Sequence, residues 1–284
     1  MRTTLVSLPT DTVPLDGAFY EPAAGATAGA ALLFHGNTTN FYSGPSRFLP
    51  PHLARLGLAC LAFNRRGHDI LGVRDSREPV GTAFQTIGEA IADNRIAAEW
   101  LAARGFPRPV VIGHSNGGML AVRHVADHAA TPALVLLSAH CGGRALAPRI
   151  SRAGLFAGDR LEELTDRARA LVAAGRGSEL MLLPGWWYVI SAASFVDLLT
   201  EVPDLLELAP KIACPTLFVR GDEEPRDLYP AEDFQARAGG PCAVEIVPRC
   251  NHFYVGREDA VAALVSAWLD RTLGLRAVVD PARA

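Results

Sequence analysis

Short apolar runs alternate with amphipathic helical segments along most of this chain, and this alternation constrains the fold most. The runs typical of buried strands lie at residues 30–34, 58–63, 109–112, 133–137, 216–219 and 244–247. They follow an opening pair of strands at 5–8 and 17–20. Segments with helical spacing lie at 46–56, 88–103, 117–130 and 259–273. Strands that alternate with helices predict an α/β fold with a mostly parallel central sheet and helices on both faces.

One stretch, residues 142–208, breaks this alternation. It shows no convincing buried strand but two helical segments, 161–174 and 191–199. A connection of this length between two strands is far longer than usual. We therefore expect a core formed by residues 1–141 and 209–284, with residues 142–208 inserted as a helical lid.

Composition excludes several classes of function. The chain has 284 residues, of which 49% are hydrophobic, and its 27 basic and 30 acidic residues give a net charge of −3. Neither sign of charge dominates, so we expect no nucleic acid partner and no membrane partner. No apolar run approaches the ~20 residues of a membrane helix. The segment that begins at Met1 lacks the charged-then-apolar pattern of a signal peptide, so we expect a cytoplasmic protein. We also expect a monomer or homodimer with a small-molecule substrate.

No metal or organic cofactor is expected. The five cysteines show no CxxC spacing and are read as buried, reduced thiols. His124 and His128 are four residues apart on one predicted helix face, but no acidic third ligand lies nearby.

The strongest chemical signal is the run Gly113-His114-Ser115-Asn116-Gly117-Gly118. It fits G-x-S-x-G and lies between a predicted strand and a predicted helix, as the motif requires. In such a tight turn, side chains at Gly113 and Gly117 would collide with their surroundings. The turn places Ser115 at a helix N-terminus, where the dipole favours negative charge. Ser115 is therefore the candidate nucleophile.

A serine nucleophile needs a histidine base that is held by a carboxylate. Among the eight histidines, only His252 follows the last predicted strand and precedes the last helix, and active groups gather at such strand ends. The acid should follow the preceding strand. Four carboxylates compete there, and chemistry alone does not choose among them: Asp222, Glu223, Glu224 and Asp227.

Two backbone amides are candidates for an oxyanion hole. His35-Gly36-Asn37 follows the strand at 30–34, and a glycine there lets the backbone approach a substrate. The amides of Asn37 and Asn116 would then point at the developing oxyanion, while His35 braces the loop. One such donor typically contributes ~3 kcal/mol to the transition state.

Together, the motifs around His35, Ser115 and His252 resemble those of the α/β-hydrolase superfamily. The run from Asn64 to His68 also resembles the Arg-Gly-His stretch of many members. The resemblance covers about residues 13–274 and implies that the triad acid lies three residues after the glycine of a G-x-x-D motif. Counting from Gly221 gives Glu224, where the family usually has Asp, so Asp222 stays an alternative.

The resemblance implies a lid-bearing serine hydrolase similar to carboxylesterases, with a weaker likeness to the branch that contains siderophore esterases. We expect it to cleave an ester or lactone of a moderately large apolar or aromatic molecule through an acyl-enzyme. A ligand receptor built on this fold and an acyltransferase are the alternatives. The expected substrate contacts are Phe41, Tyr42, Trp186, Trp187, Tyr188 and Phe195.

Overall fold

Eight strands form one central sheet in this computed structural model, which describes residues 1–23, 27–74, 77–185 and 188–275. The strand order is β1-β2-β4-β3-β5-β6-β9-β10. Strand β2 is antiparallel to both neighbours, and the other neighbouring pairs are parallel. The bounds are β1 Arg2–Leu8, β2 Leu15–Glu21, β3 Gly29–Phe34, β4 Leu58–Phe63, β5 Val110–His114, β6 Leu134–Leu137, β9 Thr216–Gly221 and β10 Cys242–Val247. The predicted mostly parallel sheet is confirmed.

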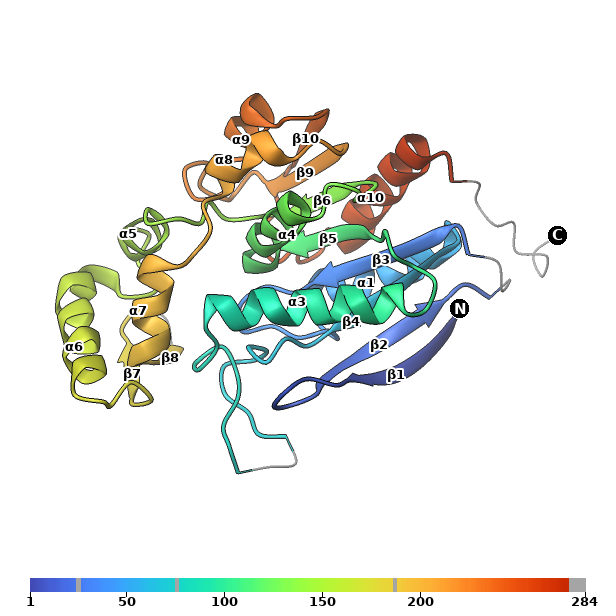
Figure 1. Cartoon of the computed structure of the whole chain (residues 1–284). Coiled ribbons are helices and arrows are strands. Elements are labelled where there is room, and N and C mark those ends of the chain that lie inside the picture. The colour runs from blue at the N-terminus through green and yellow to red at the C-terminus, as the bar shows by residue number, and fades with distance from the viewer. Residues whose placement is uncertain (24–26, 75–76, 186–187, 276–284) are drawn as a thin grey trace.

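Helices cover both faces of this sheet (Figure 1). One face carries α3 (Ile87–Ala102), α4 (Asn116–Asp127), α8 (Leu205–Leu208) and α9 (Ala231–Arg237). The other carries α1 (Gly44–Phe48), α2 (Pro50–Arg55) and α10 (Glu258–Leu273). The single helix predicted at 46–56 is two helices that meet at Leu49, because two prolines follow that residue and favour a new helix start there.

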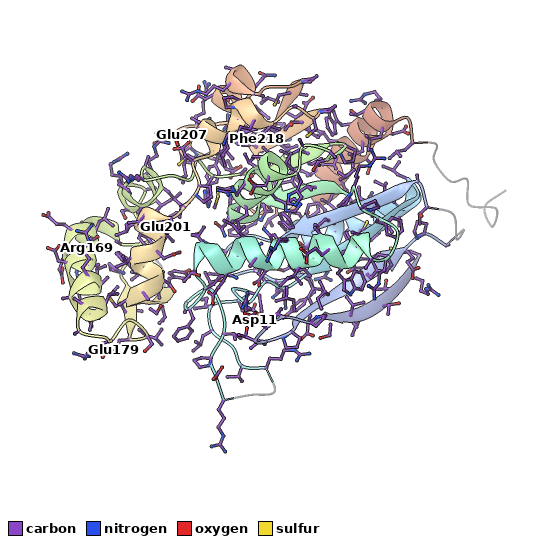
Figure 2. All side chains as sticks on the ribbon, in the orientation of Figure 1. Asp11, Arg169, Glu179, Glu201, Glu207 and Phe218 are labelled. Carbon is purple, nitrogen blue, oxygen red and sulfur yellow. The ribbon has the colours of Figure 1, made fainter. Side chains whose placement is uncertain are left out.

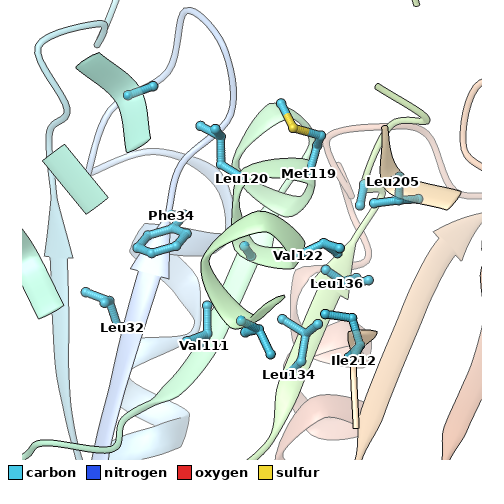
Figure 3. Close-up of a cluster of buried hydrophobic side chains, with 14 of the residues drawn as sticks. Leu32, Phe34, Val111, Met119, Leu120, Val122, Leu134, Leu136, Leu205 and Ile212 are labelled. Atoms are coloured by element: carbon cyan, nitrogen blue, oxygen red, sulfur yellow. The ribbon is translucent and has the colours of Figure 1, made fainter. Parts of the chain in front are cut away.

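The strands bury alternate residues in two separate hydrophobic clusters. On β3, Leu32 and Phe34 belong to the cluster beneath α3 and α4, whereas Ala31 and Leu33 belong to the cluster beneath α2 and α10. Figure 3 shows the first cluster, in which Val122 of α4 lies beside Leu136 of β6. Apolar residues on both faces of β3 thus have a partner layer, which explains why such a central strand reads as a continuous apolar run.

The chain between β6 and β9 forms a third cluster of its own. It contains α5 (Leu146–Arg152), α6 (Leu161–Ala173), α7 (Ala192–Thr200) and the 3-10 turn η1 (Gly158–Arg160). A second 3-10 turn, η2 (Ala209–Lys211), lies just before β9. This third cluster also contains an antiparallel hairpin, β7 (Leu180–Leu183) with β8 (Tyr188–Ser191), which the sequence did not predict. Phe156 and Phe195 stack at 5.1 Å in the centre of this cluster. These elements gather at one side of the molecule (Figure 1).

Most charged side chains lie on the outside of this assembly. Arg169 is exposed on the outer side of α6, whereas Phe218 lies buried between β9 and α9 (Figure 2). Among the helices of the described ranges, none combines the length and apolar character that crossing a bilayer requires.

Candidate active site

Ser115 occupies the sharp turn between β5 and α4. Its backbone has φ 55° and ψ −120°, a strained conformation for a residue with a side chain. A Cβ at Gly113 would lie 2.3 Å from the Gly117 carbonyl oxygen, and one at Gly117 would lie 2.2 Å from the Phe34 carbonyl oxygen. Only glycine fits at either position, for the steric reason that the sequence suggested.

His252 lies in the loop between β10 and α10, beside this turn. Its Nδ1–H donates to Glu224 Oε1 at 2.7 Å, so its unprotonated Nε2 can accept from the Ser115 hydroxyl, whose Oγ is 3.0 Å away. The ring of Tyr229 packs against the imidazole with centroids 5.0 Å apart. The imidazole thus joins a hydroxyl on one side to a carboxylate on the other.

Glu224, rather than Asp222, is the carboxylate that reaches His252. Glu224 is buried, and its second oxygen accepts from Gly221 N at 2.8 Å. Asp222 points to a different loop, where its Oδ1 accepts from Cys250 N at 3.1 Å. Backbone N–H groups there, with that of Arg249 first, hold the pKa of the Asp222 carboxyl below its usual range. Asp222 braces the loop before His252.

Two further side chains, which the sequence analysis did not single out, complete the surroundings of Glu224. Ser138 follows β6 with a positive φ of 46° and donates to Glu224 Oε2 at 2.7 Å. The Tyr254 hydroxyl lies 2.7 Å from Ser138 Oγ, and because the Ser138 proton goes to the carboxylate, Tyr254 supplies the proton of this bond. Burial raises the pKa of Tyr254, so it stays a donor. A serine directly after a buried strand was the available signal.

Of the two proposed oxyanion donors, Asn37 lines the same cavity as Ser115, and Asn116 directly follows Ser115 in the chain. Asn37 follows β3 in the loop opened by Gly36, and Asn116 is the first residue of α4. A Cβ at Gly36 would lie 3.1 Å from the Ser115 Cβ, so the loop lies directly against the serine. Within the described part of the chain, no acceptor occupies the backbone amide of Asn37 or of Asn116. Both amides are thus available to an oxygen beside Ser115.

A buried cation holds the loop that leads to Asn37. The Arg65 side chain is fully buried, and its Nη2 donates to the His35 carbonyl oxygen at 2.7 Å. The Arg65 backbone N–H donates to His35 Nε2 at 3.1 Å, while His35 Nδ1–H donates to Gly36 O at 2.7 Å. His35 therefore uses both ring nitrogens to brace the loop. Among the described residues, no carboxylate is hydrogen-bonded to Arg65, and Asp93 pairs with Arg66 instead.

Ser115 opens into a largely apolar cavity of about 260 Å³. Its apolar wall comes from the segment between β6 and β9 and from the loops after β9 and β10. The members of this wall are Leu146, Ile150, Leu155, Phe156, Tyr188, Leu198, Leu228, Tyr229 and Phe253. A buried His140 also lines it, with Nδ1 accepting from Gly142 N and Nε2 bonded to Asn116 Oδ1.

The expected substrate contacts divide into three groups. Tyr188 lines the cavity. Phe41, Tyr42 and Phe195 do not: Phe41 packs against the core beneath α2, Tyr42 is 56% exposed, and Phe195 is fully buried in the cluster between β6 and β9. Trp186 and Trp187 lie outside the described residues. Three of the expected aromatic contacts thus lie away from the cavity, and its apolar wall combines aliphatic with other aromatic residues.

Several histidines are buried uncharged, and this predicts acid sensitivity. Burial lowers the pKa of His114 to about 3 and those of His124 and His140 to about 4, and it lowers that of His35 well below its ordinary value. In the unfolded chain, each takes up a proton near pH 6.5. The stability that they support is therefore present above about pH 6.5 and declines as the pH falls towards 4.

For each unit by which the pH falls within that window, protonation of each of these histidines in the unfolded chain should lower the free energy of unfolding by ~1.4 kcal/mol. Urea unfolding at pH 7, 6 and 5 measures this slope, and His124→Gln, which lies outside the cavity, should reduce it by about one proton. A free energy of unfolding that stays constant from pH 7 to pH 5 would contradict the assignment.

The paired histidines of α4 form no metal site with their surroundings. The rings of His124 and His128 stack at 4.1 Å, and His128 Nδ1–H donates to the His124 carbonyl oxygen at 2.7 Å. In the described ranges, no three His, Cys, Asp or Glu side chains converge in a way that could hold a metal ion.

Comparison with known proteins identifies relatives by sequence and by fold. Residues 31–264 match the sequence profile of the Alpha/beta hydrolase family. No curated protein sequence matches the chain at a significant level.

Three solved structures illustrate the similarity of fold. Est1E from Butyrivibrio proteoclasticus superposes with a TM-score of 0.70 at 17% identity, covering 95% of this chain and 99% of that one. A thermostable carboxyl esterase from Bacillus coagulans gives 0.69 at 15% identity, covering 96% and 99%. A monoglyceride lipase variant from Saccharomyces cerevisiae gives 0.66 at 16% identity, covering 96% of each chain. At these identities the likeness concerns the fold alone.

Proposed function

Because the chain belongs to the alpha/beta hydrolase family, we propose that it is a serine hydrolase that cleaves carboxylic esters through an acyl-enzyme intermediate. The observation that carries the proposal is the chain of hydrogen bonds from Ser115 through His252 to Glu224. This is the arrangement that activates a serine hydroxyl, whatever the fold around it. The esterases and the lipase of similar fold agree with this chemistry.

Acylation begins when Ser115 Oγ attacks the ester carbonyl carbon and its proton passes to His252 Nε2. The imidazolium that forms is stabilised by Glu224, which Ser138 and Gly221 hold in place. The amides of Asn37 and Asn116 donate to the oxyanion of the tetrahedral intermediate. The intermediate collapses when His252 gives its proton to the departing alcohol oxygen, which leaves the acyl group on Ser115.

Deacylation repeats these steps with water in place of serine. His252 Nε2 takes a proton from the water as its oxygen attacks the acyl carbonyl carbon. The same two amides hold the second oxyanion. The C–O bond to Ser115 breaks, His252 returns the proton to Ser115 Oγ, and the carboxylic acid departs.

The segment 142–208 acts as a lid in this proposal and selects the substrate. It supplies Leu146, Ile150, Leu155, Phe156, Tyr188 and Leu198 to the cavity, so the acyl group enters an apolar enclosure. Each methylene added to the acyl chain, until the cavity is full, should raise kcat/KM by about fourfold, which corresponds to ~0.8 kcal/mol per buried methylene. The substrate class is therefore an ester of a moderately large apolar acid.

Hydrolysis of a series of p-nitrophenyl esters from acetate to decanoate tests the proposal. We expect turnover by the wild type, rising from acetate to medium-length acyl groups, and at least ~10³-fold less turnover by Ser115→Ala. Slow release of one equivalent of p-nitrophenol without turnover would contradict hydrolysis. Product formation that depends on an added alcohol would identify acyl transfer instead.

A further inference from the structure

A small niche, lined by both polar and apolar side chains, adjoins the apolar cavity on the side where α7 meets α3. Its volume is about 30 Å³, close to that of one water molecule. It shares Asn37, Leu146, Tyr188 and Leu198 with the cavity that contains Ser115, so the two spaces have a common wall. Beyond this wall the lining includes polar side chains that the proposed mechanism does not use.

Two buried side chains on this niche have unused donors. Asn116 is 6% exposed, and its Oδ1 is bonded to His140 Nε2, which orients the amide so that Nδ2 is the free end. Ser194 is 3% exposed and its Oγ accepts from the Ser191 hydroxyl at 2.9 Å, which leaves its own proton without an acceptor in the described part of the chain. Each side chain thus retains a donor that a ligand oxygen in the niche could use.

Asp197 supplies the complementary acceptor. Its Oδ2 accepts from the Ile87 amide at the start of α3 at 2.7 Å, and its Oδ1 has no donor among the described residues. This bond ties α7 to α3, and a second one, from Ser191 N to the Ala83 carbonyl oxygen at 2.7 Å, anchors the start of α7. The niche therefore has fixed walls that come from the core and from the lid.

The chemistry of these groups defines the ligand. Two donors and one acceptor match a group that both accepts and donates hydrogen bonds. The negative charge of Asp197, reinforced by Glu201 and Glu89 nearby, disfavours a carboxylate. The volume admits one oxygen-sized group. A hydroxyl meets all three conditions.

We propose that Asn116, Ser194 and Asp197 form a binding subsite for a hydroxyl group at the distal end of the acyl chain. The inference rests on the proposed esterase function and narrows its substrate class. The natural substrate is then an ester of an acid with an apolar body and one terminal hydroxyl.

Matched ester pairs test this inference. Each pair shares the p-nitrophenyl leaving group and differs only in a terminal hydroxyl on acyl chains of six to ten carbons. An apolar cavity without the subsite rejects a hydroxyl about tenfold or more at every length. The subsite predicts one length at which the hydroxylated ester equals or exceeds its parent in kcat/KM. Rejection at every length would overturn the inference.

Substitutions on α7 test whether the preference for the hydroxylated ester arises at the proposed subsite. Ser194→Ala should lower the ratio of hydroxylated to parent kcat/KM by about tenfold at the preferred length. Asp197→Asn should raise the relative rate of the matched carboxylate-tipped ester, because the repelling charge is gone. Thr200→Val, an isosteric change on the same helix away from the niche, is the control and should leave both ratios as they are. Equal ratios in all four proteins would overturn the inference.

A failure of the esterase proposal can be distinguished from a failure of the subsite proposal. Absence of turnover on both members of every pair would contradict the function, not the subsite. The same acyl chains prepared as methyl ketones, which cannot be hydrolysed, then report the preference through calorimetric binding. Tighter binding of a hydroxylated ketone at one chain length supports the subsite, and weaker binding at all lengths contradicts it.

Discussion

Replacing His252 with alanine is expected to lower kcat on a p-nitrophenyl ester by about 10⁴- to 10⁶-fold. His252 Nε2 lies 3.0 Å from Ser115 Oγ and is the group positioned to take its proton. Without that base the hydroxyl remains a weak nucleophile, and loss of one member of such a triad costs nearly as much as loss of all three. Stopped assays at high enzyme concentration measure the residual rate.

His128→Ala is the matched control for this substitution. His128 is an exposed histidine on α4 that does not line the cavity. Its replacement should change kcat by less than about twofold. A His252→Ala enzyme that is folded and retains more than about one percent of the wild-type rate would contradict the role of His252 as the base.

Replacing Glu224 with glutamine is expected to lower kcat by about 10⁴-fold. The carboxylate accepts from His252 Nδ1–H and so keeps the unprotonated nitrogen towards Ser115. An amide in its place can donate to Nδ1, which moves the imidazole proton to Nε2 and blocks proton transfer from the serine. The corresponding change in another serine hydrolase triad has an effect of this size through the wrong tautomer.

Asp222→Asn is the comparison that distinguishes the two candidate acids. Asp222 contacts the backbone of Cys250 and not the imidazole, so its replacement should lower kcat by less than about tenfold. The loss of kcat in Glu224→Asp should lie between those in Asp222→Asn and Glu224→Gln, because a carboxylate on a side chain one methylene shorter cannot keep the 2.7 Å contacts to both His252 and Ser138. A larger loss from Asp222→Asn than from Glu224→Gln would reverse the assignment.

Much of the core could be predicted from the sequence because burial on both faces leaves a clear pattern. The inner strands β3, β4 and β6 read as short, continuous apolar runs, as in β4, where all six residues are buried. The hairpin β7–β8 lacks so clear a pattern, and the sequence analysis missed it. Its strands have only four residues each, and so short an apolar run cannot be distinguished from part of a helix by periodicity.

In the site, likewise, some features follow from the local sequence and others depend on tertiary contacts. The position of Ser115 follows from local sterics, since Gly113 and Gly117 admit no side chain. The geometry around Glu224 depends on tertiary contacts, because Ser138 and Gly221 hold one of its oxygens. The misplaced contacts Phe41 and Phe195 have a common cause, because large aromatic residues are as useful for packing as for binding a substrate.

The most direct test of the account is intact-mass measurement after treatment with a fluorophosphonate probe. The probe phosphonylates a serine only when a neighbouring base activates its hydroxyl. We expect one adduct on the wild type and none on Ser115→Ala, with greatly slowed labelling of His252→Ala. A folded wild-type protein that acquires no adduct, or an adduct that persists in Ser115→Ala, would contradict the assignment of Ser115 as the nucleophile.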